Sequence, residues 1–231
     1  LIVCACTIVG FQVYQVSIRQ YEQTSSQQFS LIEQTIDLFI QNNKNTVKML
    51  ADHPTVQVAD ASLNNYTAIK QDVLLKNVPK GQTEQEMVAL FKRIHNGYSD
   101  TAEVFFGSKW GSFVSSWDDA LSAGFDPRKR VWYQLAEAAG GATIVTPAYM
   151  STIGTPGICF SQQVLSPAGE FIGCVSAEVK LEQLTAFIDS IKVGKTGYVM
   201  LFQNDGAILA DPVHPDLVFT TLNNAGNAYL K

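Results

Sequence analysis

Charged residues, cysteines and histidines are scarce in this chain. Only 16% of its 231 residues are Asp, Glu, Lys or Arg, the net charge is -5, and no cluster of Lys and Arg stands out. A nucleic-acid partner is therefore poorly supported, because such a partner requires a basic surface. The 4 cysteines and 3 histidines are scattered without the spacing of metal ligands. The sequence thus predicts no disulfide framework, no metal site and no cofactor.

The motifs of common enzymes are missing as well. No GxSxG segment surrounds a serine, and residues 194–197 (GKTG) lack the upstream glycine of a phosphate-binding loop. Asp118 and Asp119 form a carboxylate pair, but adjacent side chains point apart and both fall in a predicted loop. These absences favour a module that is not an enzyme.

The apolar residues are concentrated at the start of the chain. Residues 1–16 read LIVCACTIVGFQVYQV, and the first charge is Arg19. This run is slightly shorter than the about 20 residues that span a bilayer, so we expect residues 1–18 to be a partial transmembrane helix. A signal peptide is an alternative, although a basic start and a small-residue cleavage site are not visible. A buried core helix is the third possibility.

A long helix is predicted over residues 19–54. The segment from 17 to 51 contains no Gly or Pro, and apolar residues recur along it at steps of three and four. We interpret it as a stalk that continues the anchor and ends before Pro54, because the residue before proline avoids the helical region. The alternative is a core helix of a compact bundle.

The rest of the chain predicts helices packed on antiparallel strands. The fold class is α+β: a long N-terminal helix followed by two antiparallel-sheet modules, of which the second is truncated. Turn residues and periodicity place helices at 84–95, 125–140 and 181–192. The expected strands are 101–107, 112–116, 142–147, 157–165, 170–179, 197–203 and 207–210.

The strands 157–165 and 170–179 are expected to form a hairpin. A turn centred on Ala168 places Cys174 opposite Gln162 and Cys159 opposite Ala177. Side chains alternate along a strand, so this register puts the two thiols on opposite faces of the sheet and predicts that both stay unpaired.

The order of these parts resembles the double Cache (dCache) sensor region of bacterial methyl-accepting chemotaxis proteins. Residues 125–133 (FDPRKRVWY) resemble the (Y/F)DPRxRxWY segment of that family, and residues 169–181 and 194–212 look like its hairpin and the opening of its membrane-proximal module. The resemblance covers about 20 to 231. It implies two PAS-like modules: a membrane-distal ligand-binding module at 55–190 and the start of a membrane-proximal module at 191–231.

The resemblance implies that Arg130, Trp132 and Tyr133 hold the carboxylate of a ligand, with Phe125 at the aromatic start of the motif. A guanidinium grips a carboxylate with two parallel hydrogen bonds, and Tyr and Trp add donors. On an ideal helix Arg130 and Tyr133 share a face, whereas Trp132 points elsewhere by about 160°. The three converge only if the first turn is irregular, or if Trp132 forms the wall from behind. The alternative is that Trp132 and Tyr133 are core aromatics.

The amine side of the expected pocket departs from the family pattern. Tyr149 resembles the family's pocket tyrosine, but Ser151 and Glu178 stand where the amino-acid-binding pattern expects Asp. An ammonium needs several acceptors in a buried site. The ligand is therefore expected to be an amino acid held differently, a methylated amine or an organic acid.

The resemblance implies an extracytoplasmic sensor in the bacterial inner membrane, anchored by the N-terminal helix and forming a homodimer. A chemoreceptor is the favoured whole protein. A sensor histidine kinase or a diguanylate cyclase with the same input region is the alternative. An adhesive ectodomain is a third class, but it would not require the arginine of the motif.

Overall fold

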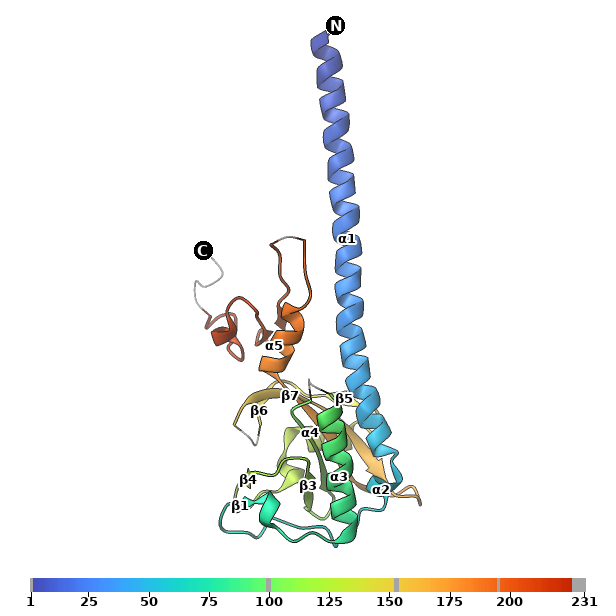
Figure 1. Ribbon diagram of the computed structural model, residues 1–231, viewed down its shortest axis with the longest axis vertical. Coiled ribbons are helices and arrows are strands. Elements are labelled where there is room, and N and C mark those ends of the chain that lie inside the picture. Colours follow the sequence, from blue (N-terminus) through green and yellow to red (C-terminus); the bar gives the residue numbers. More distant parts are fainter. Residues whose placement is uncertain (1, 99–100, 152–153, 195, 226–231) are drawn as a thin grey trace. The chain divides into compact units, whose positions relative to one another are not determined.

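The computed structural model describes residues 2–98, 101–151, 154–194 and 196–225 (Figure 1). Leu1 of the expected anchor, and Lys195 and residues 226–231 of the expected second module, lie outside the described residues. The chain divides into two compact units, Leu1–Gln41 and Asn42–Lys231. The α+β class with a long N-terminal helix is confirmed.

Helix α1 (Ile2–Ala51) is continuous through the boundary expected near residue 18. It ends before Pro54, as predicted, and the chain turns at once into α2 (Pro54–Gln57). His53 caps α2, because its Nδ1 atom accepts a hydrogen bond from the Thr55 backbone N–H at 3.2 Å. Asn43, Val47 and Leu50, near the end of α1, are buried.

Within the described part of the chain, we find no helix that combines the length and the apolar character needed to cross a bilayer. The anchor expected at residues 1–18 stays a prediction.

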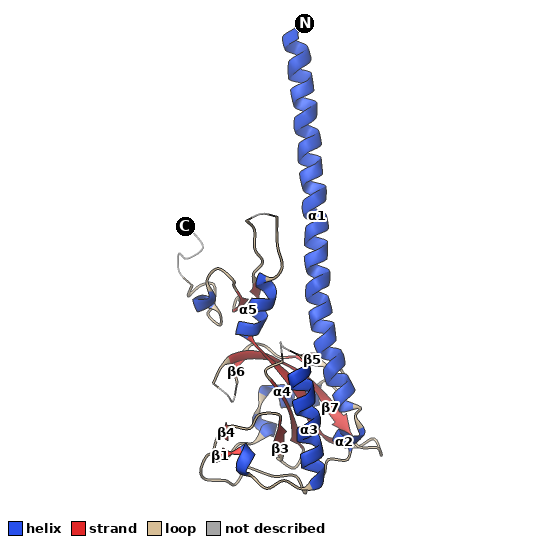
Figure 2. Cartoon of the chain, viewed as in Figure 1, coloured by secondary structure: helices blue, strands red, loops and turns tan. Residues whose placement is uncertain are grey.

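The centre of the second unit is a six-stranded antiparallel sheet with strand order β3-β2-β8-β7-β5, and β6 also pairs with β7. Figure 2 draws the strands in red and the helices in blue. Both hairpins expected in this part, β2 with β3 and β7 with β8, are present. The strands are β2 (Glu103–Ser108), β3 (Phe113–Ser115), β5 (Ile144–Val145), β6 (Tyr149–Met150), β7 (Pro156–Leu165) and β8 (Phe171–Lys180).

Shorter elements complete the unit. Helix α3 (Gln82–Gly97) contains the predicted helix and contacts β2, while α4 (Val131–Ala138) contacts β7 and β8. A small sheet joins β1 (Val73–Leu74) to β4 (Ala120–Leu121). After β8 come α5 (Leu181–Asp189) and a hairpin of β9 (Leu201–Phe202) with β10 (Ile208–Ala210). The remaining elements are the 3-10 turns η1 (Leu75–Asn77), η2 (Pro127–Lys129) and η3 (Pro215–Leu217).

The register predicted for the β7–β8 hairpin is wrong by one residue. Cys159 lies opposite Glu178, and Cys174 lies opposite Gln163. The shift arises at a bulge beside Val164, which turn geometry alone does not reveal. The bulge adjoins Gly173, where a Cβ atom would lie 2.2 Å from the Gly107 carbonyl oxygen, so only glycine allows β2 to approach this closely.

This register places both thiols on one face of the sheet, not on opposite faces. Cys159 and Cys174 are nevertheless free, as predicted, and both are buried. Glu178, the partner of Cys159, lies four positions after Cys174 on β8, which corresponds to about 13 Å along the strand. That separation is too long for a disulfide.

Trp132 and Pro127 lie directly on β2 because the strand carries glycine beneath them. A Cβ atom at Gly107 would lie 2.6 Å from the Pro127 Cβ and 2.7 Å from the Trp132 Cη2. Both contacts are shorter than carbon atoms tolerate, so Gly107 sets how closely the segment 125–133 packs on the sheet.

Replacing Gly107 by Ala is expected to destabilise the fold by about 1–3 kcal/mol, because the added methyl group overpacks this contact. Urea unfolding followed by circular dichroism measures the change. Gly97→Ala is the matched control, since a Cβ atom there meets nothing within 4 Å. Equal unfolding midpoints for the two variants would contradict the proposed packing role.

Candidate functional site

The segment expected to form one helix from Phe125 is broken into two. Asp126 caps η2, as predicted, by accepting a hydrogen bond from the Arg128 backbone N–H at 3.1 Å. Arg130 is then extended, with φ -90° and ψ 144°, and α4 begins only at Val131. The irregular first turn that convergence of the motif requires is therefore present.

The two arginines of the motif have different partners. Arg128 forms a bidentate pair with Asp126, with Nε–Oδ1 and Nη2–Oδ2 distances of 2.8 and 2.9 Å. Arg130 is half-buried, and its guanidinium lies over the Phe125 ring, 5.5 Å from the centroid. Among the described residues, no carboxylate lies within ion-pair distance of Arg130. Arg130 is thus held by an aromatic face while its donors have no anionic partner.

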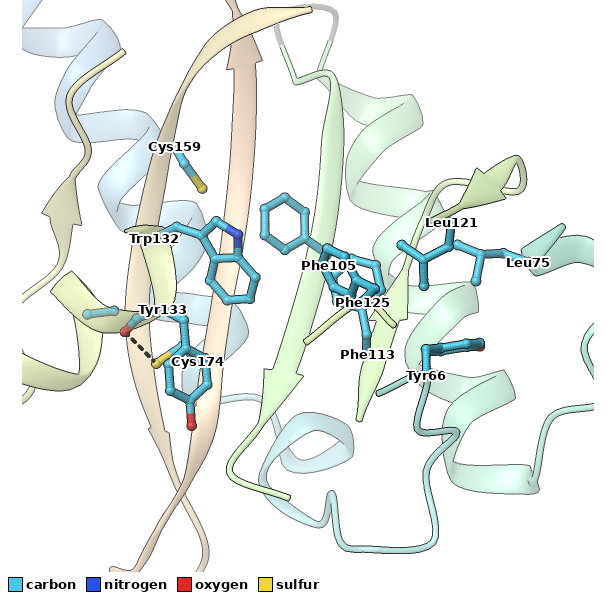
Figure 3. Packing of buried hydrophobic residues seen from close by; sticks show 11 residues of the cluster. Tyr66, Leu75, Phe105, Phe113, Leu121, Phe125, Trp132, Tyr133, Cys159 and Cys174 are labelled. Atoms are coloured by element: carbon cyan, nitrogen blue, oxygen red, sulfur yellow. Dashed lines mark hydrogen bonds between the residues drawn. The ribbon is translucent and has the colours of Figure 1, made fainter. Parts of the chain in front are cut away.

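Trp132 and Tyr133 pack in an aromatic cluster between α4 and the sheet (Figure 3). The Trp132 ring lies 4.8 Å from that of Phe105, and the Tyr133 ring lies 6.2 Å from that of Phe171. Cys174 donates a weak hydrogen bond from Sγ to the Tyr133 carbonyl oxygen at 3.7 Å. Both side chains have the burial of core aromatics, so their contact with a ligand stays a prediction.

Glu178 does not stand alone, because Glu103 on β2 is its direct cross-strand partner. Paired side chains on antiparallel strands share a face, with Cβ atoms about 5 Å apart. The two residues are 2% and 1% exposed, Glu103 and Glu178 respectively. Ser115 donates a hydrogen bond to Glu103 Oε1, and the Tyr149 hydroxyl donates one to Glu178 Oε2. Within the described chain, Glu103 Oε2 and Glu178 Oε1 have no hydrogen-bond partner.

The surroundings of this acid pair favour its protonated form. Burial raises the pKa of Glu103 to about 8, and the Glu178 carboxylate adds to the rise. Burial also raises the pKa of Glu178, whereas the Tyr149 and Ser151 hydroxyls and the cations Lys180 and Arg130 lower it. Lys180 therefore acts electrostatically on both carboxyl groups, and Arg130 acts on Glu178.

Tyr149 and Ser151 belong to the same site as Glu178. Burial raises the pKa of Tyr149 well above its usual range, so Tyr149 acts as a neutral hydrogen-bond donor. Ser151 is buried, and its hydroxyl lies 3.5 Å from that of Thr155. Space for the Glu178 side chain comes from Gly157, where a Cβ atom would lie 3.3 Å from Glu178 Cγ.

Glu103 was not among the residues predicted for the site. A signal was present in the sequence, since residues 102–106 (AEVFF) place one acid within a buried apolar strand. A charged residue is almost never fully buried without a partner. The sequence does not predict that β2 pairs with β8, which brings Glu103 to Glu178.

Asp118 and Asp119, the adjacent carboxylates noted in the sequence, lie apart from the acid pair. Asp118 pairs with Lys92 at 2.5 Å, and Asp119 Oδ1 accepts from the Ala120 backbone N–H at 3.0 Å. Both border a cavity of about 440 Å³ that His95 also lines. Their observed partners are not the groups of the acid pair.

The family model of the Cache domain (dCache_1) matches residues 11–227 of this chain. The methyl-accepting chemotaxis protein McpB of Bacillus subtilis (strain 168) is 29% identical over 143 residues, and McpA of Pseudomonas putida is 33% identical over 110 residues. These alignments cover 61% and 47% of this chain but only 21% and 17% of the relatives.

Solved structures share the architecture. The ligand-binding domain of the amino-acid chemoreceptor PctC of Pseudomonas aeruginosa PAO1, in complex with GABA, is 26% identical with a TM-score of 0.63, over 86% of this chain and 79% of that one. The ligand-binding domain of CtaA of Pseudomonas fluorescens, in complex with L-serine, shares the fold at 21% identity and a TM-score of 0.62, over 86% and 75% of the two chains. The extracellular domain of a putative histidine kinase also shares the fold, at 14% identity and a TM-score of 0.60, over 84% and 72%.

Replacing Glu103 by Gln should change how stability depends on pH. The pKa of Glu103 is about 8 in the folded chain and near 4.5 ordinarily, so between these values only the folded chain holds the proton. The stability that Glu103 contributes to the folded chain is complete below pH 4.5 and is lost as pH rises toward 8. We expect Glu103→Gln to gain stability relative to the wild type on going from pH 5 to pH 8.

Urea unfolding at pH 5, 6.5 and 8 measures this difference. Glu170→Gln, a change of an exposed acid in the β7–β8 turn, is the control and should follow the wild type at each pH. A Glu103→Gln variant that loses stability relative to the wild type as pH rises would show that the carboxyl is stabilised in its charged form.

Proposed function

The chain belongs to the Cache domain family of chemoreceptor sensor regions, and from this membership we propose that it is the extracytoplasmic ligand-binding part of a bacterial transmembrane chemoreceptor acting in chemotaxis. Its relatives are sensors and not enzymes, in agreement with the prediction from the sequence. The ligand is a small metabolite that carries both a carboxylate and an amine, bound in the distal module.

This proposal rests on two groups of opposite charge that are available to a ligand, the Arg130 guanidinium and the Glu103–Glu178 acid pair. Arg130 has no carboxylate partner among the described residues, and it acts electrostatically on Glu178 of the buried acid pair. A zwitterion satisfies both groups at once: its carboxylate pairs with the guanidinium and its ammonium with the acids. PctC and CtaA bind ligands of this kind, GABA and L-serine.

The other ligand classes fit less well. An organic acid without an amine leaves the two free oxygens of the acid pair without a hydrogen-bond donor, and buried acceptors without a partner are unfavourable. A methylated amine carries fewer N–H donors for the two free carboxyl oxygens. Among whole proteins, the chemoreceptor is favoured over the histidine kinase, because the curated relatives are chemotaxis proteins whereas the kinase domain shares only the fold.

A route for the signal runs through β6. The Ala148 backbone N–H donates a hydrogen bond of 2.7 Å to Gln203 Oε1, in the β9–β10 hairpin. The next residue, Tyr149, donates to Glu178. A change at the acid pair on ligand binding is thereby transmitted to the expected proximal module through the adjacent residues Tyr149 and Ala148. A ligand shifts this arrangement only by its differential affinity for two states. We expect a homodimer, anchored in the membrane by the N-terminal helix, to carry the shift across it.

Replacing Arg130 by Ala is expected to weaken binding of the ligand by about 2–5 kcal/mol, because it leaves a carboxylate in the site without its partner. Isothermal titration calorimetry with GABA, L-serine and L-glutamine measures the change. Lys129→Ala, an exposed neighbour in the same turn, is the control and should keep wild-type affinity. Unchanged affinity of Arg130→Ala for the tightest of these ligands would exclude Arg130 from the site.

Replacing Gln203 by Ala is expected to separate binding from signal transfer. The variant should keep its affinity for the ligand, since Gln203 bonds to Ala148, the residue before β6, and not to the acid pair. Ligand should, however, no longer increase the hydrogen-exchange protection of the β9–β10 hairpin, because its hydrogen bond to Ala148 is gone. Equal ligand-induced protection in the variant and the wild type would place the signal route elsewhere.

A further inference from the structure

Glu103 lies outside the motif on which the ligand site was predicted, yet it lies directly across from Glu178 in the sheet. The two are paired residues of β2 and β8, and each is at least 98% buried. Each carboxyl accepts one hydrogen bond from a neighbouring hydroxyl, Ser115 for Glu103 and Tyr149 for Glu178. Each keeps one oxygen with no hydrogen-bond partner among the described residues, Oε2 of Glu103 and Oε1 of Glu178.

Of the described groups, the Ser151 hydroxyl acts on Glu178 and lowers its pKa, but it does not reach hydrogen-bond geometry with the free Glu178 oxygen. Lys180 influences both carboxyl groups electrostatically, but its ammonium lies over the Trp117 ring at 6.0 Å and forms no ion pair in the described chain. Arg130 is stacked on Phe125. Cys159, the partner of Glu178 on β7, has a pKa raised by burial and is a neutral thiol. Two buried acceptor oxygens thus remain for a group that the described part of the chain does not provide.

We propose that Glu103 and Glu178 together bind the primary ammonium group of the ligand, and that its binding releases a proton which the pair holds in the free protein. This inference rests on the proposed function, because it assigns the amine half of the same ligand. The geometry assigns Glu103 as a second carboxylate partner, in addition to the position expected from the family pattern.

The charges balance in this step. Two carboxylates at one cross-strand position repel each other, so the free pair keeps a proton on one oxygen at neutral pH. An ammonium replaces that proton: two N–H groups donate to the free oxygens and the proton passes to solvent. The third N–H remains for a hydroxyl such as that of Ser151. The pair carries charge -2 when occupied, opposed by the ammonium and by the nearby cations Arg130 and Lys180.

This arrangement selects one class of amine. A primary ammonium has three N–H donors for the free oxygens, whereas a trimethylammonium has none. An amine-free acid neither displaces the proton nor fills the position. The site is therefore specific for primary amines, and its affinity depends on pH although the charge of the ligand does not change.

Calorimetry of the full chain with GABA, L-serine and L-glutamine, in two buffers of different ionisation enthalpy, counts the protons released. We expect about one proton per ligand at pH 7 for the wild type, and affinity that rises by up to about tenfold per pH unit from pH 5.5 to 7.5. Glu103→Gln should release almost none, bind roughly tenfold or more weakly at pH 7.5 and lose the pH dependence. Glu170→Gln should match the wild type.

Matched ligands complete the test. Butyrate and the trimethylated analogue of GABA should both bind much more weakly than GABA. If Glu103→Gln binds and releases protons like the wild type while Arg130→Ala binds weakly, Glu103 is not a ligand partner and the proposed function stands. If butyrate binds as tightly as GABA, or none of the amino acids binds, the amine-bearing ligand class itself is wrong and the inference falls with it.

Discussion

The pairing of Glu103 with Glu178 across β2 and β8 places two carboxyl groups at a position that water does not reach. Burial of one carboxyl group disfavours its charge, and a second one at the same position disfavours the charge further. The neighbours of the pair are the groups that make this burial tolerable. Hydroxyl donors approach from β3 and β6, and glycine at position 157 leaves the Glu178 side chain its space.

The geometry of the motif at residues 125–133 depends on the break between η2 and α4. Had the motif formed one regular helix, Trp132 would point away from Arg130. The Asp126–Arg128 pair and Pro127 instead close a short 3-10 turn, and the extended Arg130 restarts the chain as α4. Trp132 then rests on β2 over a glycine, and Arg130 stays at the edge of the core without an ion-pair partner among the described residues. This one local irregularity therefore sets the positions of both Trp132 and Arg130 relative to the sheet.

The cysteines show how a small error in register changes a conclusion. Alternation along β8 correctly places Cys174, Ser176 and Glu178 on one face, since that follows from strand geometry alone. The position of Cys159 depends on its partner across the hairpin, and the bulge beside Val164 moves that partner by one residue. The same shift sets Cys159 opposite Glu178 and makes it part of the wall of the acid pair.

The sequence by itself determined the long helix, its end before Pro54, the cap at Asp126, the hairpins and the aromatic–arginine motif. Each of these depends on residues within a few positions of one another, through helical periodicity, capping or turn geometry. Only the tertiary structure decided which strands pair, in which register, and that Glu103 meets Glu178. Those contacts join residues 75 positions apart, and they follow from close approaches such as that of Gly173 to Gly107, which no local pattern encodes.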